Sequence, residues 1–96
     1  MPHITVTANA QANLHKLHQF IAAERPDSAI KAMETIVVAI ERLKQFPELG
    51  VEHELVQGMR LLTVPFGKSG YVVYYRYVRP LDRVFILKVK HGRELG

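Results

Sequence analysis

The spacing of apolar residues changes from helical to strand-like at the segment Pro47-Glu48-Leu49-Gly50. From about residue 8 up to this segment, apolar residues recur at the spacing of one helix face; after it, they alternate or run together as in strands. Proline and glycine within the segment predict a turn at the change. A chain of 96 residues with 48% apolar content can build one compact core but rarely two. We therefore predict a single domain, residues 1–96, in which helices precede most of the strands.

The first half predicts two helices that form an antiparallel hairpin. From about residue 8 to residue 25, apolar residues at helical spacing form one stripe, which Pro26 ends. Asp27 or Ser28 is suited to cap a second helix, which runs to about Phe46. The apolar stripe of this second helix consists of Ala29, Met33, Ile36, Ile40 and Leu43. Because the connection around Pro26 is short, the two helices are expected to lie antiparallel.

Strands are expected on both sides of this hairpin. A short strand is predicted at residues 3–7, where Ile4 and Val6 alternate with polar neighbours. Further strands are predicted at residues 52–56, 59–64, 70–78 and 83–89. The segment 79–82 predicts a tight turn, because its proline pre-sets the bend. The predicted fold class is α+β: an N-terminal strand, then a two-helix hairpin packed on a mainly antiparallel β-sheet.

Positive charge is concentrated in the second half of the sequence. Residues 1–48 contain five Lys or Arg and five Asp or Glu, whereas residues 49–96 contain eight and four, which accounts for the net charge of +4. A localised basic surface attracts polyanions or acidic proteins. The alternative is ordinary solubilising charge on strand edges. The sequence has no cysteine and no apolar run near 18 residues, so we expect a soluble cytoplasmic protein without disulfides or membrane contact.

Motif searches predict neither a metal site nor a cofactor. His15 and His18 lie three positions apart on the first helix, but no Asp, Glu or Cys accompanies them at ligand spacing. The stretch Gly67-Lys68-Ser69 resembles the end of a phosphate-binding loop. Leu62 stands where that motif needs its first glycine, and a strand follows where a helix is required.

The end of the last strand carries the residues best suited to chemistry. His91 lies beside Lys90 and near Arg93, where an imidazole can transfer protons at neutral pH. Arginines such as Arg60, Arg76 and Arg93 can hold a phosphate with two hydrogen bonds. Together they would suit RNA cleavage by the 2′-hydroxyl. The alternative is that His91 is a hydrogen-bonded residue at a sheet end with a structural role.

Two further patterns allow a structural or a binding interpretation. Alternation places Tyr71, Tyr75 and Tyr77 on the strand face opposite Tyr74, where tyrosines either stack on bases or complete the core. The second helix is apolar around more than half of its circumference. It is therefore either deeply buried or exposes apolar residues to a partner helix.

In order and spacing, the sequence resembles the RelE/ParE superfamily, the toxins of bacterial toxin-antitoxin pairs. The resemblance rests on Pro26 with Ala29, on Gly58-Met59-Arg60, on residues 70–76 and 84–87, and on His91-Gly92-Arg93. It implies a cognate antitoxin protein as partner, and contact with operator DNA only through that antitoxin. ParE-like members poison DNA gyrase without catalysis, whereas RelE-like members cut messenger RNA on the ribosome. The long second helix and the His-Gly-Arg ending favour the ParE branch. The alternative remains a RelE-like endoribonuclease.

The resemblance also assigns candidate residues. Its functional surface would contain Arg60, Tyr75, Lys90, His91 and Arg93. If the protein is a nuclease, its catalytic residues would be His91, Arg60, Arg93, Arg76 and His53. The antitoxin would contact Met33, Val37 and Ile40 on the second helix. The lysine pair that RelE carries before its Gly-x-Arg motif is replaced here by Glu52-His53-Glu54.

Overall fold

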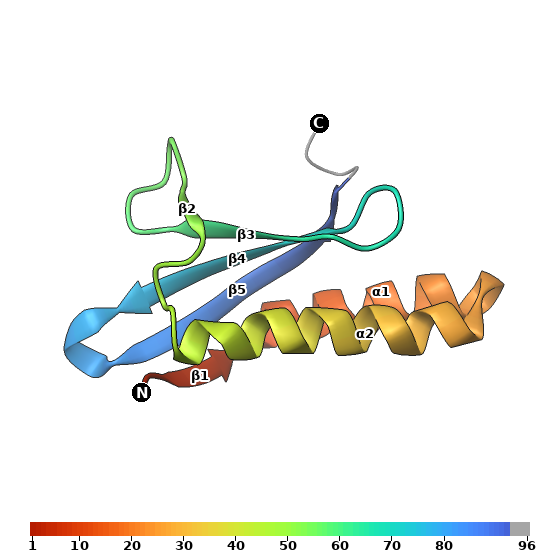
Figure 1. Ribbon diagram of the computed structural model, residues 1–96, viewed down its shortest axis with the longest axis horizontal. Helices are drawn as coiled ribbons and strands as arrows, with labels where there is room; N and C mark the ends of the chain where they lie inside the picture. Colours follow the sequence, from red (N-terminus) through yellow and green to blue (C-terminus); the bar gives the residue numbers. More distant parts are fainter. Residues whose placement is uncertain (93–96) are drawn as a thin grey trace.

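The computed structural model describes residues 1–92, which form one five-stranded sheet with two helices on one of its faces (Figure 1). The elements are β1 (His3–Val6), α1 (Ala8–Glu24), α2 (Pro26–Glu41), a 3₁₀ turn (Arg42–Lys44), β2 (Val51–Glu52), β3 (Arg60–Val64), β4 (Tyr71–Val78), a second 3₁₀ turn (Arg79–Leu81) and β5 (Arg83–His91). The strand order is β1-β5-β4-β3-β2. The predicted α+β fold is confirmed. Neither described helix is long and apolar enough to cross a membrane.

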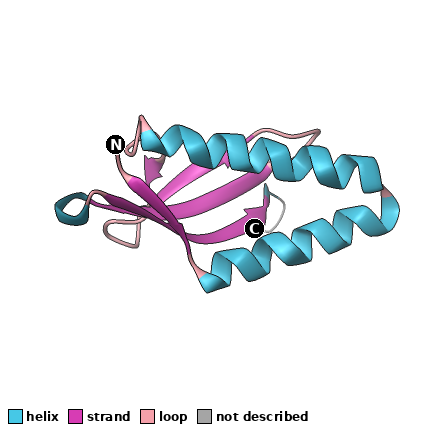
Figure 2. Cartoon of the chain, turned by 90° about the horizontal axis from the view of Figure 1, so that it is seen from below, coloured by secondary structure: helices cyan, strands magenta, loops and turns pink. Residues whose placement is uncertain are grey.

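The helical hairpin turns at a single residue, Arg25, which ends α1 and immediately precedes α2 (Figure 2). At its start, α1 is capped by Thr7, whose hydroxyl accepts a hydrogen bond from the amide of Ala10. The predicted cap of α2 at Asp27 or Ser28 is wrong. Pro26 is itself the first helical residue, because its fixed φ suits that position and its missing N–H has no partner there to lose.

The strand pairing is antiparallel except at one edge, where β1 runs parallel to β5. The β2 strand is shorter than the predicted 52–56, because His53 ends it in a turn. Its Nδ1 accepts hydrogen bonds from the amides of Leu55 and Val56, both at 3.0 Å. The predicted turn between β4 and β5 is present as a 3₁₀ turn that contains Pro80.

The core lies between the hairpin and the sheet. From the helices it takes Ala10, Ala32, Ile36, Ile40 and Leu43. From the sheet it takes Val64, Tyr71, Val73, Tyr75, Val84, Ile86 and Val89. The predicted placement of Tyr71, Tyr75 and Tyr77 opposite Tyr74 is confirmed, since the first three pack with this core and Tyr74 does not.

A β-bulge at Leu87 reverses which side chains of β5 face the helices. Tyr75 pairs with Ile86 but Tyr74 pairs with Lys88, so Leu87 is the extra residue. Before the bulge, Val84 and Ile86 face the core; after it, Val89 does. Lys88 therefore lies on the open face of the sheet.

The start of α1 holds this bulge in place. The hydroxyl of Thr7 donates to the carbonyl of Ile86 at 2.7 Å, and the Asn9 amide donates to the carbonyl of Leu87 at 2.9 Å. The amide of Val89 donates to Asn13 Oδ1 at 3.0 Å. The pairing of β1 with β5 ends at Val6 and Ile86, so side chains from Thr7 and the start of α1 satisfy the backbone groups of β5 beyond that point.

Candidate functional site

Arg60, the arginine of the Gly-x-Arg strand, is held by the segment that leads into β2. Its Nη1 donates to the carbonyls of Gly50 at 2.7 Å and Glu48 at 3.2 Å. Its Nη2 lies 3.4 Å from carboxylate oxygens of both Glu48 and Glu52. The Arg60 side chain is 20% exposed, and Glu48 also pairs with Arg79 at 2.8 Å. Two carboxylates and two carbonyls therefore already surround the guanidinium that was expected to meet a phosphate.

Tyr75 lies directly beneath this cluster and is fully buried. It was expected on the functional surface, and its burial corrects that expectation. The phenol oxygen accepts a hydrogen bond from the amide of Gly50 at 2.7 Å. Burial raises the pKa of Tyr75 above its usual value, while the Gly50 hydrogen bond and the nearby Arg60 partly oppose the shift. Tyr75 is therefore a core residue that anchors the turn after the helices.

His53 and Arg76 do not join the cluster around Arg60, because each has contacts of its own in the β2–β3 loop. Because His53 Nδ1 accepts from two backbone amides, only its Nε2 is available to a ligand. Arg76 extends over the β2–β3 loop, where its Nη1 would lie 3.0 Å from a Cβ added at Gly58. Arg76 and Arg60 belong to opposite faces of the sheet, because Arg60 pairs with the core residue Tyr75.

His91 lies at the other end of the sheet, on the helix-covered face. It pairs with Tyr71 across the β4–β5 ladder, and their rings meet edge to face with centroids 5.5 Å apart. A groove of about 500 Å³ between α1 and the sheet is lined by both rings together with Lys16 and Phe20. Burial also raises the pKa of Tyr71. Lys90 precedes His91 and occupies the opposite face, while Arg93 lies outside the described residues.

The structure does not bring the candidate catalytic residues together. Arg60 pairs with Tyr75 and His91 pairs with Tyr71, so the two lie four residues apart along β4. At the usual rise of a strand this separation is about 13 Å. One phosphate cannot bridge that distance. Among residues 1–92, no group of three or more His, Asp or Glu side chains is placed to hold a metal ion.

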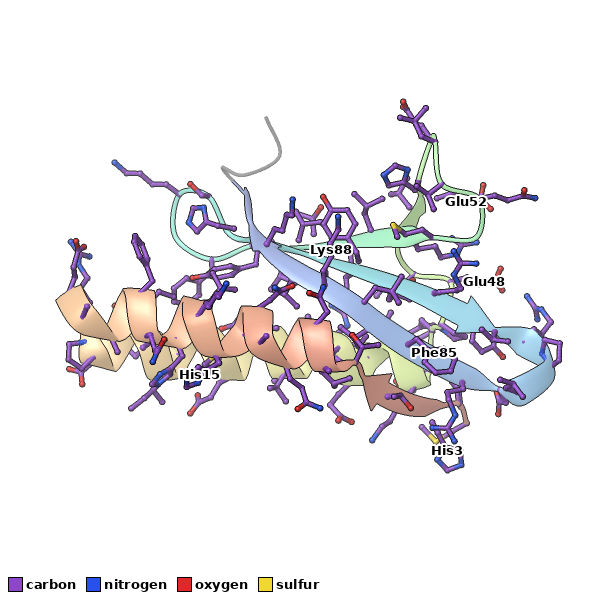
Figure 3. All side chains as sticks on the ribbon, turned by 180° about the vertical axis from the view of Figure 1, so that it is seen from behind. His3, His15, Glu48, Glu52, Phe85 and Lys88 are labelled. Atoms are coloured by element: carbon purple, nitrogen blue, oxygen red, sulfur yellow. The ribbon has the colours of Figure 1, made fainter. Side chains whose placement is uncertain are left out.

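The open face of the sheet carries a set of cations that sequence patterns did not single out as a group. Lys88 lies over the ring of Tyr74, with its Nζ 4.5 Å from the ring centroid. In Figure 3, Lys88 rises from β5 away from the helices. Arg83 lies at the start of β5, where its Nη1 donates to Thr5 Oγ1 at 2.7 Å. These cations could not be assigned to one face from the sequence, because simple alternation without the bulge at Leu87 places Lys88 with the core residues of β5.

On α2, the three expected antitoxin contacts differ in exposure. Val37 is 52% exposed, Met33 is partly buried against the core, and Ile40 is only 6% exposed. Ile40 is therefore a core residue and not a freely presented contact. Ile30 and Val38 of the same helix are both more than half exposed. The sequence alone does not show which apolar stripe of α2 faces the sheet.

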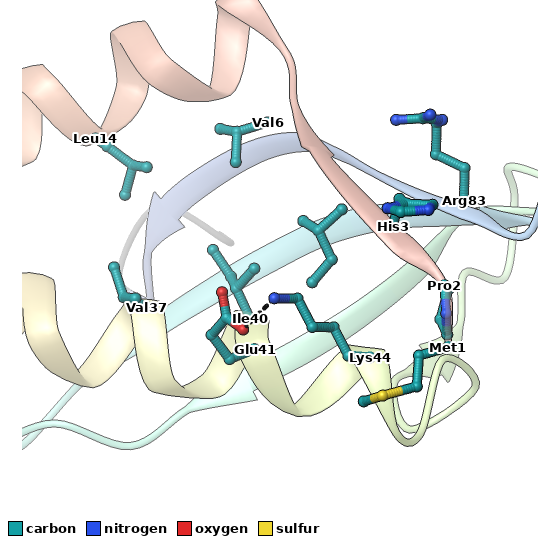
Figure 4. A pocket seen from close by; sticks show the side chains of 11 residues that line it. Met1, Pro2, His3, Val6, Leu14, Val37, Ile40, Glu41, Lys44 and Arg83 are labelled. Atoms are coloured by element: carbon teal, nitrogen blue, oxygen red, sulfur yellow. Dashed lines mark ion pairs between the residues drawn. The ribbon is translucent and has the colours of Figure 1, made fainter.

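A second groove separates α2 from the N-terminal strand. Its volume is about 540 Å³, and Figure 4 shows Val37 and Ile40 on one side with Val6 and Leu14 facing them. The Glu41–Lys44 ion pair, at 2.7 Å, lies at its border.

Comparison with known proteins identifies the family. The family described as ParE toxin of the type II toxin-antitoxin system parDE matches residues 4–96. The chain belongs to this ParE toxin family. It is also 35% identical, over 94 residues and 98% of both chains, to the protein named Toxin RelE3 of Caulobacter vibrioides. The RelE/ParE resemblance is therefore confirmed, and the protein is a type II toxin of this superfamily.

Solved structures agree with the fold of this ParE family member. A chain of the chromosomal ParDE system of P. aeruginosa matches with a TM-score of 0.78 and 24% identity, covering 95% of this chain and 96% of that one. A chain of the RelBE2 toxin-antitoxin complex of Mycobacterium tuberculosis matches with a TM-score of 0.59 and 26% identity, covering 95% of this chain and 99% of that one. A chain of the intact E. coli RelBE complex matches with a TM-score of 0.60 and 13% identity, covering 94% of this chain and 95% of that one.

Proposed function

We propose that this toxin inhibits DNA gyrase by binding, without chemistry of its own, and that a cognate antitoxin neutralises it in the cytoplasm. The observation that carries the proposal is the state of Arg60. A nuclease of this fold needs a cation aimed at the scissile phosphate. Here the Arg60 guanidinium already donates to two carbonyls and pairs with Glu48 and Glu52. The membership in the ParE family supports the same choice of target.

The separation of His91 from Arg60 supports a binding role for both. A base and a phosphate ligand act on one group only if they meet within hydrogen-bond reach of it. His91 instead borders the groove beside Phe20, which is 73% exposed. An exposed aromatic next to an imidazole and Lys16 suits contact with a protein surface.

The antitoxin is proposed to cover the exposed stripe of α2. Ile30, Met33 and Val37 recur at helical spacing, and Val37 also lines the groove beside β1. Such a stripe suits an apolar segment of a partner protein. The structural relatives belong to toxin-antitoxin systems, which supports this kind of partner. Contact with operator DNA is proposed to occur through the antitoxin.

The test measures both candidate activities on one preparation of purified toxin. Gyrase supercoiling is assayed first, and messenger RNA cleavage is assayed on translating ribosomes. We expect inhibition of supercoiling with intact message. Cleavage of the message with unaffected gyrase would overturn the proposal.

The alternative function is a ribosome-dependent ribonuclease, which the 35% identity to a protein named RelE3 favours. The variant His91→Ala separates the two functions. If His91 is a general base, cleavage falls about 100-fold or more, whereas a gyrase inhibitor loses only the energy of one contact. His15→Ala, on the outer side of α1, is the matched control and should change neither activity (Figure 3).

A further inference from the structure

The sheet face that the helices leave open is strongly cationic. Cross-strand pairing places Arg76 of β4 and Arg83, Lys88 and Lys90 of β5 on this face, opposite the core residues. In the described residues, every such outward position on β1, β3, β4 and β5 is apolar, hydroxyl-bearing, histidine or cationic. We call these four cations and the strands beneath them the open sheet face.

Among residues 1–92, the acids next to the sheet have partners other than these four cations. Glu48 pairs with Arg60 and Arg79, and Glu52 pairs with Arg60. Figure 3 shows both glutamates near β2. Asp82 lies in the turn before β5, where it accepts a hydrogen bond from the Tyr77 hydroxyl at 2.9 Å. Four of the eight Lys and Arg residues of the second half therefore lie on one side of the sheet, and the field of such a group attracts a polyanion.

The geometry of the cations suits a phosphate backbone and not unpaired bases. Lys88 and Lys90 are two positions apart on one face of β5, about 6.6 Å by strand geometry, which is close to the spacing of successive phosphates. Two aromatic side chains belong to this face. Tyr74 is 6% exposed beneath Lys88 and cannot offer its ring for base stacking, whereas Phe85, which pairs with Arg76, is partly buried. One partly buried ring does not form a platform on which successive unpaired bases could stack. The partner should therefore be a duplex, whose bases are already stacked.

We propose that the open sheet face binds the backbone of double-stranded DNA without sequence preference. The choice of DNA over other duplexes rests on the proposed function, because gyrase works on a DNA duplex. Lys88 and Lys90 contact neighbouring phosphates, and Arg83 and Arg76 extend the contact along the same face. The toxin thereby contacts DNA in addition to protein when it inhibits gyrase.

The test measures binding of the purified full chain to a fluorescently labelled DNA duplex of about 30 base pairs, without gyrase, from about 50 to 200 mM KCl. Lys88→Gln/Lys90→Gln removes two charges from the open sheet face. Lys31→Gln/Arg42→Gln removes the same charge from exposed positions of α2 and the 3₁₀ turn that follows it, and is the matched control. We expect the first variant to bind about 10-fold more weakly or worse at 100 mM salt, with the salt slope reduced by about 2. The control should change binding less than about 3-fold.

A second variant guards against misfolding. Arg83→Gln/Lys90→Gln leaves Lys88 over Tyr74, and circular dichroism with thermal unfolding confirms that each variant is folded. It should also weaken binding about 10-fold. Absence of DNA binding by the parent protein at about 50 mM KCl, or equal losses in the open-face and helix variants, would overturn the inference. Equal affinity for an RNA duplex of the same length would overturn the assignment to DNA.

The outcome is separable from that of the proposed function. DNA binding is measured without gyrase, and supercoiling inhibition is measured on the same proteins. DNA binding by a toxin that leaves gyrase active would refute the proposed function and leave the duplex-binding face in place. Gyrase inhibition by a toxin that does not bind DNA would refute this inference alone.

Discussion

The amide of Gly50 donates a hydrogen bond to the phenol oxygen of Tyr75 at 2.7 Å, inside the protein. A Cβ at Gly50 would lie 2.7 Å from Tyr75 Cε1 and 2.8 Å from the carbonyl oxygen of Leu61. The turn that follows the helices is thus fixed against the middle of the sheet by contact as well as by hydrogen bonding. This relationship also positions the carbonyl of Gly50 that Arg60 binds.

Both partners of this contact are expected to be sensitive to substitution. Gly50→Ala should lower the free energy of unfolding by about 1–3 kcal/mol through overpacking. Tyr75→Phe should lower it by about 1–3 kcal/mol, because the buried Gly50 amide loses its acceptor. Tyr77→Phe, which loses an exposed hydrogen bond to Asp82, is the control and should cost less than about 1 kcal/mol. Urea unfolding measures all three; equal losses in the two tyrosine variants would contradict this account.

Alkaline pH should destabilise the protein through its buried tyrosines. Burial raises the pKa of Tyr71 and Tyr75 above 10.0 in the folded state. Above about pH 10 the unfolded chain therefore loses these protons first, and the free energy of unfolding falls as pH rises further. Urea unfolding between about pH 8 and pH 11 should show this fall, and Tyr75→Phe should make it shallower. An unchanged slope in Tyr75→Phe would show that this phenol does not contribute.

Removal of the Asn13 side chain should weaken the bulge at Leu87. Asn13→Ala leaves the amide of Val89, a buried residue, without its acceptor, so we expect a loss of about 1–3 kcal/mol. Asn9→Ala removes an exposed hydrogen bond to Leu87 and should cost about 0.5–1 kcal/mol. Amide hydrogen exchange should show faster exchange at Val89 in the first variant only. Equal protection of Val89 in both would argue against a role for Asn13.

Arg60 is expected to act on stability more than Arg79, although both pair with Glu48. Arg60→Lys keeps the charge but cannot reach the same set of carbonyls and carboxylates, and should cost about 1–2 kcal/mol. Arg79→Lys alters a pair in which both side chains are largely exposed, and should change stability by less than about 0.5 kcal/mol. Thermal unfolding distinguishes them. If Arg60→Lys leaves the thermal stability unchanged, the role of this arginine lies in function and not in structure.

The helices and most strands could be predicted because each has a regular apolar period. The ends were harder to place where one residue serves two elements. Arg25 ends α1 and precedes α2, so the search for a capping side chain in residues 27–28 was misleading. The early end of β2 depends on the His53 ring, whose acceptor role has no sequence period.

The candidate site was less predictable because it depends on contacts between distant residues. Arg60 and Glu48 are twelve positions apart, and only the folded turn brings them together. The bulge at Leu87 shifts the alternation of β5, so a strict period assigns Lys88 to the wrong face. The alternation of tyrosines favoured the core for Tyr75, but it could not show that the phenol oxygen meets the amide of Gly50 inside the protein.

The parallel pairing of β1 with β5 has a consequence for synthesis of the toxin. Residues 3–6 find their partners only at residues 83–86, and β5 lies between β1 and β4 in the sheet. A ribosome must therefore release nearly the entire chain before the sheet can close, and such long-range pairing is slow to form. Until then the nascent chain lacks the groove between α1 and the sheet, the groove between α2 and β1, and the cations of β5. An antitoxin already present in the cell thus has an interval in which to meet the toxin as it first becomes active.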